Sequence, residues 1–380
     1  MSAKVLFYVP GLVDGGGERL WSCLASAIQA RGFDVIFAQD FEASENRCNL
    51  DSRIPVHTLG RNHRRSVLAL ARLLRTEKPD IALAAVGGSN LKLMLAKALA
   101  RSPVRTVLTF HGSREWKTGL LSFLSYLGLP VLTTIADRTV AVSDGLKQEL
   151  IHRWRARKNR VTTILNPVFF PASAPVPTEV ELKERAPILL AVGRFVAEKD
   201  FITLVRAFAR LDHPSAKLVI LGKGPEEREL RLEIARLRLK SRVELPGYSQ
   251  EPWSYYAKAK CLVLSSVSEP FGNVVVEALA FGLPVVATAC EGPQEILRHG
   301  QFGRIVACRN EFQLADAIRD TLDEPGDPLA RRRRADAFSF AQRVPLYEAL
   351  IRDVLRESGA PSPQPETSAV VNDPLVKQPT

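Results

Sequence analysis

The sequence predicts an α/β protein in which two parallel-sheet domains face each other across a cleft. The chain has 380 residues, which is more than one hydrophobic core usually organises. Short apolar runs alternate with longer amphipathic runs, the pattern of strands joined by helices. This alternation stops at a proline-containing segment near the middle of the chain and then starts again. We therefore expect two domains, each with its own sheet.

Five apolar runs predict the sheet of the first domain. They are residues 4–9, 34–39, 81–86, 105–110 and 138–143. Between them, amphipathic helices are predicted at residues 17–32, 66–79 and 89–102. The first apolar run is short for a signal peptide and is followed by glycines and acids, so a buried strand explains it better. These elements predict an N-terminal domain over residues 1–168.

A second set of runs predicts a second sheet of the same kind. Strands are expected at residues 187–193, 216–222, 242–247, 261–266 and 283–289, and helices at 199–211 and 225–239. The segment 169–187 has closely spaced prolines and is expected to be an extended linker. It precedes a C-terminal domain over 188–343. The polar residues 358–380 are expected to form a disordered tail.

Composition and charge limit the kinds of protein that this chain can be. Its five cysteines lie far apart, without a C-x-x-C pair or a histidine cluster, which indicates a reducing compartment and argues against structural zinc or disulfides. The formal net charge is +11, with basic clusters at 61–65, 152–160 and 331–334. A solvated basic surface, nucleic acid or an anionic membrane would explain these clusters. They lack a nucleic-acid recognition motif, so no nucleic-acid partner is expected.

The stretch SEPFGNVVVEALAFGLPVVAT, residues 268–288, carries two carboxylates eight positions apart. Glu269 follows a predicted strand and is expected in a loop that faces the cleft. Asn273 is expected to cap the next helix, whose first amides would form an anion site. Glu277 lies in the first two turns and suits a diol such as ribose, because a carboxylate only accepts hydrogen bonds. Each acid alone could instead be a surface acid or a partner of the helix dipole.

Arg194 and Lys199 flank a turn that follows the predicted strand 187–193. Two cations at the carboxyl end of a strand are what a diphosphate leaving group needs. Asp200 is expected to cap the helix that comes next. The alternative is a pair of solvated surface cations.

Two loops of the N-terminal half complete the set. Gly15 and Gly16 come directly before a predicted helix, where backbone amides can approach a phosphate, although a tight turn without a ligand is the alternative. His111 directly follows the predicted strand 105–110. A lone histidine is more often structural, but at the carboxyl end of a strand we expect it to be a functional group.

Together these loops resemble family 4 of the retaining glycosyltransferases, which have the GT-B fold of two Rossmann-like domains. The similarity runs from GGGERL (15–20) through TFHG (109–112) and VGRFVAEKD (192–200) to GPQEIL (292–297). Its specific elements are E-x7-E, formed by Glu269 and Glu277, and G-R-x4-K-D, which contains Arg194 and Lys199. The variant ACEGPQEIL (289–297) is similar to that of enzymes that build surface polysaccharides, lipopolysaccharide cores and lipid-linked oligosaccharides.

The resemblance implies a role for each candidate residue. His111 and Glu269 would be the catalytic groups beside the transferred sugar, and Glu277 would bind the ribose. The remaining donor-binding residues would be Gly15 or Gly16, Arg194 and Lys199 at the diphosphate, Tyr248 near the base, and the backbone of Phe271, Gly272, Asn273 and Val274. A final helix, around 344–356, would pack back on the N-terminal domain.

The activity implied is transfer of a hexose or N-acetylhexosamine from a nucleotide-diphosphate sugar, UDP-linked on family frequency, to a glycan or lipid-linked acceptor. Neither a cofactor nor a metal is implied, and the chain has no D-x-D sequence. The alternatives of the same architecture are a sugar-nucleotide epimerase, a phosphorylase, or a nucleotide-sugar-binding protein without turnover.

An anionic membrane surface is a further expected partner. Residues 120–136 are uncharged, follow Arg114 and Lys117, and belong to the domain that also holds the basic clusters 61–65 and 152–160. Apolar sequence beside basic clusters can seat a domain on an anionic leaflet. For the stretch itself, an internal helix and strand of the sheet is the favoured interpretation. The expected location is the cytoplasm, with peripheral attachment to the inner face of the plasma membrane.

Overall fold

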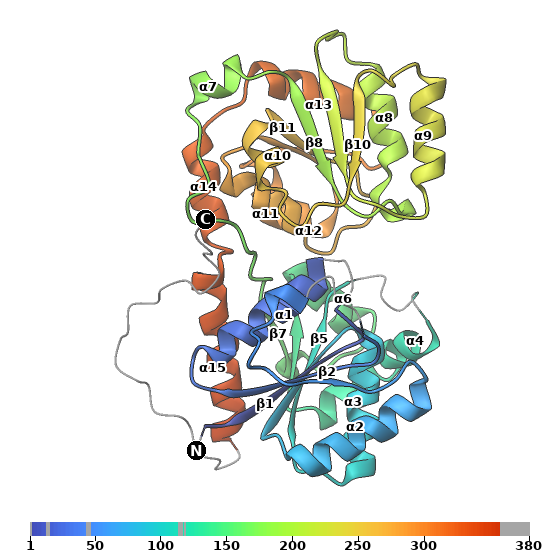
Figure 1. Cartoon of the computed structure of the whole chain (residues 1–380), viewed down its shortest axis with the longest axis vertical. Coiled ribbons are helices and arrows are strands. Elements are labelled where there is room, and N and C mark those ends of the chain that lie inside the picture. The colour runs from blue at the N-terminus through green and yellow to red at the C-terminus, as the bar shows by residue number, and fades with distance from the viewer. Residues whose placement is uncertain (1, 13–15, 43–46, 113–116, 118, 358–380) are drawn as a thin grey trace.

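The computed structural model describes residues 2–12, 16–42, 47–112, 117 and 119–357, and of residues 16 and 18 it describes the backbone alone. Gly15, Arg114 and the predicted tail 358–380 lie outside the described residues. The chain folds into two domains, each built on one parallel sheet, which are stacked along the long axis of the molecule (Figure 1). This arrangement confirms the predicted fold class.

The N-terminal sheet has seven parallel strands in the order β3-β2-β1-β4-β5-β6-β7. The strands are β1 (Lys4–Val9), β2 (Asp34–Gln39), β3 (Val56–Thr58), β4 (Ile81–Ala85), β5 (Arg105–Phe110), β6 (Arg138–Ala141) and β7 (Val161–Thr163). The helices are α1 (Gly16–Gln29), α2 (His63–Glu77), α3 (Gly87–Ala100), α4 (Leu120–Leu127), α5 (Leu129–Ile135) and α6 (Asp144–His152), with 3₁₀ turns η1 (Arg47–Asn49) and η3 (Lys158–Arg160).

Helices cover both faces of this sheet, and that explains why its central strands are continuous apolar runs. In β1, every residue from Val5 to Val9 is buried. Alternate residues of β1 pack against α1 on one face and against the α2–α3 layer on the other. β1 pairs with β2 from Lys4 opposite Asp34 to Val9 opposite Gln39, so neighbouring strands end together. Their carboxyl ends point toward the second domain (Figure 1).

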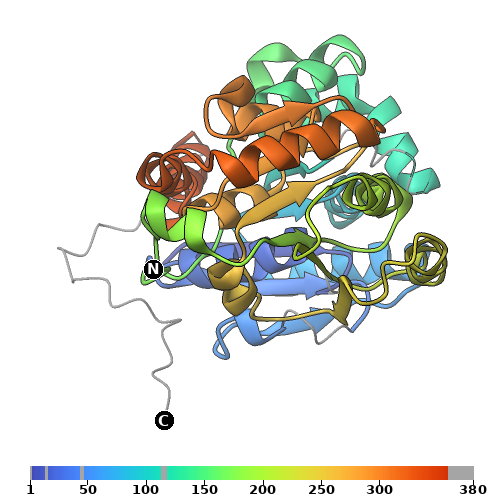
Figure 2. The same ribbon diagram turned by 90° about the horizontal axis from the view of Figure 1, so that it is seen from above.

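The C-terminal sheet has six parallel strands in the order β10-β9-β8-β11-β12-β13. The strands are β8 (Ile188–Val192), β9 (Lys217–Leu221), β10 (Val243–Gly247), β11 (Cys261–Leu264), β12 (Val285–Thr288) and β13 (Arg304–Val306). Figure 2 shows helices on both sides of this sheet. They are α8 (Phe201–Ala209), α9 (Glu227–Arg236) and α13 (Glu311–Asp323) on one face, and α10 (Trp253–Lys258), α11 (Asn273–Ala280), α12 (Glu291–Ile296) and α14 (Pro328–Asp336) on the other; η4 (Ala197–Lys199) and η5 (Arg298–Gly300) are 3₁₀ turns.

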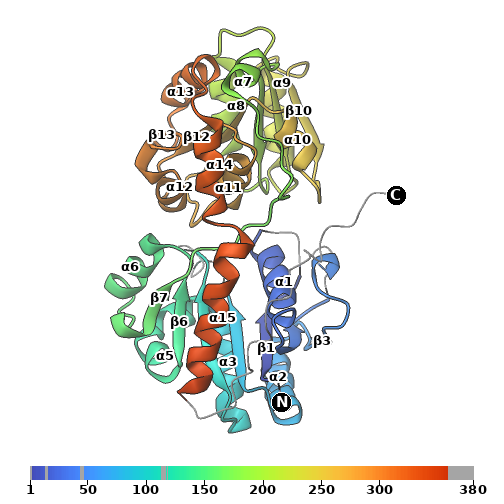
Figure 3. The same cartoon turned by 90° about the vertical axis from the view of Figure 1, so that its left-hand side faces the viewer.

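The chain passes between the domains twice, at one place. Val168, on the first passage, forms an isolated parallel bridge with Ser339 on the second, and its amide donates to the carbonyl of Phe338 at 2.8 Å. Helix α14 ends on the C-terminal domain, and α15 (Phe340–Arg356) continues down the N-terminal domain (Figure 3). There Tyr347 and other buried side chains of α15 join the core beneath α1.

The predicted linker 169–187 is not extended throughout. Residues Glu179–Glu184 form helix α7, which a capping box between Thr178 and Glu181 begins. The signal for this helix is present in the sequence as Thr178 followed three residues later by a glutamate, but the linker prediction rested on the nearby prolines alone.

The stretch 120–136 differs from its favoured interpretation as an internal helix and strand. It forms two consecutive helices, α4 and α5, and contributes no strand to the sheet. The amide of Gly128 donates to the carbonyl of Leu124 at 2.9 Å and ends α4. Pro130 then lies in the first turn of α5, where its missing amide hydrogen costs nothing.

The basic run 331–334 is not a solvated basic surface. Three of its four arginines donate to backbone carbonyls of the C-terminal domain. Buried Arg331 donates to the carbonyl of Gly282 at 2.9 Å, and Arg334 donates to the carbonyl of Ile296 at 2.8 Å. Only Arg333 of this run is exposed. The run therefore holds α14 against its own domain.

Candidate functional site

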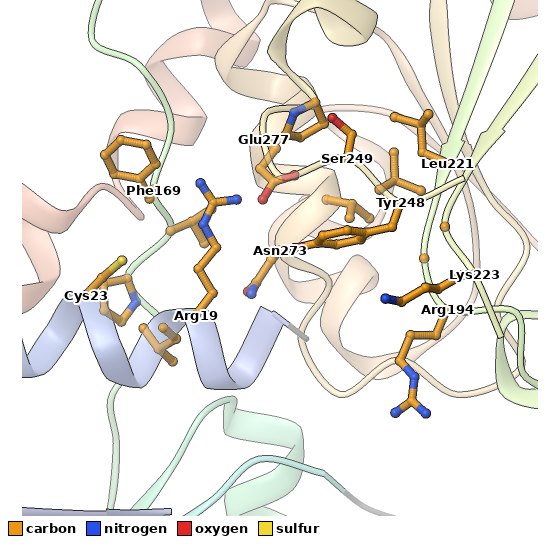
Figure 4. Close-up of a pocket in the computed structure, with 18 of the residues that line it drawn as sticks. Arg19, Cys23, Phe169, Arg194, Leu221, Lys223, Tyr248, Ser249, Asn273 and Glu277 are labelled. Carbon is orange, nitrogen blue, oxygen red and sulfur yellow. The ribbon is translucent and has the colours of Figure 1, made fainter. Parts of the chain in front are cut away.

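A pocket lies between the two domains and encloses about 970 Å³ of empty space, part of it open to solvent. The N-terminal domain contributes side chains of α1 to its wall, and the two interdomain passages contribute others. The C-terminal domain contributes the loops that follow β8, β9 and β10 and the start of α11 (Figure 4). Predicted site residues that line the pocket are Arg194, Tyr248, Asn273, Val274 and Glu277.

The turns after β8 and β9 contact each other through their backbones. The amide of Gly193 donates to the carbonyl of Leu221 at 2.9 Å. Gly222 has φ +148°, and a Cβ atom placed on it would lie 1.9 Å from the carbonyl oxygen of Gly193. Only glycine fits this approach. This close contact between the two turns places Arg194 and Lys223 side by side on the wall of the pocket (Figure 4).

The start of α11 forms the base of the site. The N-cap is Gly272, in the left-handed region at φ +99°, so the prediction that Asn273 caps this helix is wrong. Asn273 is the first helical residue, and its side chain points into the pocket (Figure 4). No side-chain capping bond is made at this end of α11, where the helix dipole favours an anion. In the turn after β8, by contrast, Asp200 caps α8 as predicted, accepting from the amide of Thr203 at 3.3 Å.

Glu277 lies at the opposite end of the pocket from Arg194 (Figure 4). Its Oε2 accepts a hydrogen bond of 2.6 Å from the hydroxyl of Tyr256. Burial raises the pKa of Glu277, while the nearby guanidinium of Arg19 and the Tyr256 hydroxyl oppose the rise. Arg19 comes from α1 of the other domain, so the two domains meet at this carboxylate.

Lys199 and Glu269 form an ion pair with each other between the loops after β8 and β11. Ser265 Oγ donates to the carbonyl of Lys199 at 2.8 Å, and Ser266 Oγ lies 3.5 Å from Glu269 Oε2. Both charged side chains are mostly buried, with exposed fractions of 21% for Lys199 and 12% for Glu269. The structure therefore brings the first carboxylate and the second cation together beside the pocket, although neither is among the residues described on its wall.

His111 directly follows β5, in the N-terminal domain. The indole Nε1 of Trp21 donates to His111 Nε2 at 3.0 Å, and Thr109 Oγ1 lies 3.1 Å from the same atom. An indole N–H can only donate, so Nε2 accepts and the neutral imidazole carries its proton on Nδ1. Burial lowers the pKa of His111 to about 4. The ring is therefore neutral at physiological pH.

The remaining predicted site residues differ in the groups that they offer to a ligand. Gly16 is the first residue of α1, and Gly15 lies outside the described residues. Phe271 is buried and its ring packs edge-on against Phe338, with centroids 5.8 Å apart, so only its backbone can serve a ligand. Tyr248 is 43% exposed, with Lys223 Nζ 5.3 Å from the centre of its ring.

Three residues of the site were missed in the sequence: Arg19, Trp21 and Lys223. Lys223 follows the predicted strand 216–222 directly, and that position was a usable signal. Arg19 and Trp21 lie inside the first amphipathic helix, where an arginine resembles a solvent-facing residue and a tryptophan a core residue. No signal in the sequence separates these two from ordinary helix residues.

Two family models match the chain, one over each domain. Residues 14–169 match the model of Glycosyltransferase Family 4, and residues 176–339 match that of Glycosyl transferases group 1. The boundary between these matches lies in the segment between the two sheets.

Curated relatives carry names from surface-glycan synthesis. The lipopolysaccharide core biosynthesis glycosyltransferase LpsE of Rhizobium meliloti is 40% identical over 40% of this chain and 43% of its own length. An N-acetylgalactosaminyltransferase of Campylobacter jejuni, whose named substrate is a diphospho-undecaprenol glycan, is 30% identical over 63% of this chain and 65% of its own length. The chain thus spans 43% and 65% of the length of these two relatives.

Solved structures share the whole fold. Anabaena HepE, in a complex with UDP and glucose, superposes with a TM-score of 0.78 at 19% identity, covering 93% of this chain and 99% of HepE. At this identity the likeness shows the fold alone, and the fold is that of two Rossmann-like domains.

The buried His111 makes fold stability depend on pH. Its folded-state pKa of about 4 lies below the ordinary value of 6.5, so the unfolded chain binds more protons between these values. Stability should therefore fall as the pH drops through this window. Urea unfolding of the wild type should show a loss of about 1–2 kcal/mol between pH 6.5 and pH 5 that His111→Gln removes.

The matched control for this measurement is His152→Gln, because His152 is exposed on α6. It should keep the wild-type pH dependence. An unchanged pH dependence in His111→Gln would show that His111 titrates normally in the folded protein.

Proposed function

Because this chain belongs to glycosyltransferase family 4, we propose that it is a retaining hexosyltransferase of cell-surface polysaccharide or lipopolysaccharide synthesis. It moves a hexose or N-acetylhexosamine from a nucleotide-diphosphate sugar to a glycan or lipid-linked glycan. One observation carries the proposal: the pocket shared by both domains has cations and the N-terminus of α11 at one end and a carboxylate at the other. That order suits a diphosphate followed by a ribose.

The diphosphate end consists of Arg194, Lys223 and the first amides of α11. Arg194 and Lys223 are both exposed and lie beside each other on the wall of the pocket, so both can reach a phosphate. Cations and helix dipoles placed where charge develops on a leaving group stabilise its departure. Lys199 would also bind the phosphate, and its ion pair with Glu269 would then weaken. Glu269 would then be available to sugar hydroxyls.

The nucleoside end consists of Glu277, which would accept from the ribose, and Tyr248, which stands near the base. UDP is the favoured donor nucleotide, and the presence of UDP in the HepE complex supports this choice. The relatives named for lipopolysaccharide core synthesis and for a diphospho-undecaprenol glycan support a lipid-linked acceptor.

Substitution with retention fits the groups of the site. Glu269 would bind sugar hydroxyls and Glu277 lies at the ribose end of the pocket, so neither is assigned as the nucleophile of a double displacement. We therefore infer that the acceptor attacks on the face that the diphosphate leaves, with the leaving phosphate taking the acceptor proton. The neutral His111, with its proton on Nδ1, can donate a hydrogen bond near the sugar without adding charge.

The N-terminal domain would sit on an anionic membrane through α4 and α5. Their outer faces expose large apolar side chains: Leu120 at 72%, Leu127 at 60%, Val131 at 62% and Ile135 at 53%, with Phe123 and Leu124 at 39% and 40%. No acidic residue occurs between 117 and 136. An apolar face of this kind suits insertion at the lipid headgroup boundary.

Basic residues flank this apolar face. The cluster 152–160 packs beside it, because the amide of Arg157 donates to Thr133 Oγ1 of α5 at 3.0 Å. Arg155, Arg157 and Lys158 are all exposed. Each basic residue near an anionic surface contributes about 1 kcal/mol. None of the described helices is long and apolar enough to cross a bilayer, so the attachment proposed is peripheral, at the inner face of the plasma membrane.

Arg194→Ala should reduce transfer from UDP-hexose or UDP-N-acetylhexosamine by about 100- to 1,000-fold in kcat, because it removes one charge from the leaving diphosphate. Release of UDP would be measured with the best of these donors. Lys217→Ala is the matched control, since Lys217 lies at the surface of the same sheet and pairs with Glu244 there. Transfer at the wild-type rate by Arg194→Ala would remove Arg194 from the leaving-group site.

The product linkage should keep the anomeric configuration of the donor. Proton NMR of the purified product, read from the coupling constant of its anomeric proton, would show this directly. An inverted linkage would exclude same-face substitution and would require a general base that activates the acceptor from the opposite face.

Phe123→Glu combined with Leu127→Glu should abolish flotation with vesicles of phosphatidylcholine and phosphatidylglycerol. The wild type should bind these vesicles at low salt, bind less at high salt, and ignore phosphatidylcholine alone. Leu232→Glu is the matched control, because Leu232 is 62% exposed but lies on the C-terminal domain. Failure of the wild type to bind anionic vesicles at low salt would point to a soluble acceptor.

A further inference from the structure

Arg19 belongs to the N-terminal domain, and its side chain lines the pocket proposed to hold the donor nucleotide. It lies in the first turns of α1, and its guanidinium carbon is 5.5 Å from the ring centre of Phe169 and 5.3 Å from that of Trp253. Figure 4 shows the side chain directed across the pocket toward Glu277. The two aromatic rings hold the guanidinium in place, so little side-chain freedom is left for a ligand to remove.

The hydrogen bonds of this guanidinium are incomplete. Arg19 Nε is buried and has no hydrogen-bond partner among the described residues. The guanidinium of Arg19 is near enough to Glu277 for its positive charge to lower the pKa of that carboxyl. Yet Glu277 takes its hydrogen bond from Tyr256, and no ion pair between Arg19 and Glu277 is formed in the described part of the chain. A buried donor without an acceptor is costly, so this geometry suits an added group.

The chemistry of the two side chains selects that group. Arginine only donates hydrogen bonds, and an ionised glutamate only accepts them. A hydroxyl satisfies both, because its hydrogen is given to Glu277 while its oxygen accepts from Arg19. A phosphate would be repelled by Glu277, and a cation would be repelled by Arg19. The cations suited to phosphate, Arg194 and Lys223, lie at the other end of the pocket (Figure 4).

We propose that Arg19 binds a ribose hydroxyl of the donor nucleotide together with Glu277 and so determines specificity for ribonucleotides. This inference rests on the proposed function, because it assigns a second residue to the nucleotide site. The ribose is then held from both domains, by α1 on one side and by α11 on the other. A nucleotide that lacks the hydroxyl leaves Arg19 and Glu277 unpaired, and sites of this kind discriminate strongly against such analogues.

The test compares affinities for UDP, 2′-deoxy-UDP and 3′-deoxy-UDP by isothermal titration calorimetry. The proteins are the full-length wild type, Arg19→Met, Arg19→Lys and the matched control Arg228→Met, in which the exposed Arg228 of α9 is replaced. GDP and its deoxy forms are measured in the same way, so that the base does not decide the outcome. Circular dichroism checks that each variant is folded.

The wild type should lose affinity by about tenfold or more when the hydroxyl beside Arg19 is removed, as expected for a hydrogen bond to a charged group. In Arg19→Met the difference in affinity between the ribo and deoxy forms should largely disappear, because the substitution weakens binding of the ribonucleotide only. Arg19→Lys should keep part of the discrimination, and Arg228→Met should keep all of it.

Three results would overturn the inference. Equal weakening of the ribo and deoxy forms by Arg19→Met would place Arg19 away from the ribose. Tighter binding of UDP to Arg19→Met would show that Arg19 obstructs Glu277. If the wild type bound no nucleoside diphosphate at all, the proposed function would fail together with this inference, a result distinct from the first two.

Discussion

The double passage of the chain at Val168 and Ser339 is the constraint on which the rest of the structure depends. Because both passages lie together, the carboxyl ends of the two parallel sheets are kept opposite each other, and loops from both domains can share one pocket. The second passage also leads into α15, whose buried face packs beneath α1. The ion pair of Arg31 with Glu348, at 2.8 Å, ties the loop after α1 to α15. The position of α1, and with it that of Arg19 and Trp21, is therefore set by the same passage that joins the domains.

Helix α1 links the histidine site of its own domain to the pocket that it shares with the other domain. Trp21 faces its own domain and donates to His111, whereas Arg19 faces the other domain and packs over the rings of Phe169 and Trp253. The two residues are two positions apart and so project from different sides of the helix. A change in the angle between the domains would move Arg19 relative to Glu277 while leaving the contact between Trp21 and His111 intact. A change in the angle between the domains can thus alter nucleotide binding without altering the hydrogen bond between Trp21 and His111.

The sheets could be predicted from the sequence because their central strands are covered on both faces and are continuous apolar runs. The edge strands β3, β7 and β13 have three residues each, too few to show a period, and they were missed. Loop residues such as Glu269 and Arg194 were found because they follow strand ends, and Glu277 was found because it lies eight positions after Glu269. Arg19 was not found, because its role depends on a contact across the domain boundary. The run 331–334 was misjudged for a related reason: side-chain charge indicated solvent, but the acceptors of Arg331 and Arg334 are backbone carbonyls, which composition does not reveal.

The charged groups of the site differ in the existing interactions that a bound substrate would replace. Lys199 and Glu269 already pair with each other, and Glu277 already accepts from Tyr256. A phosphate or hydroxyl that binds these groups replaces an existing interaction, so the net gain is only the difference between the two. Arg19 is different, since its buried Nε has no partner among the described residues. A ligand group that reaches Arg19 gains a charged hydrogen bond without breaking one. The net gain in nucleotide affinity from Arg19 should therefore exceed that from Lys199, Glu269 or Glu277.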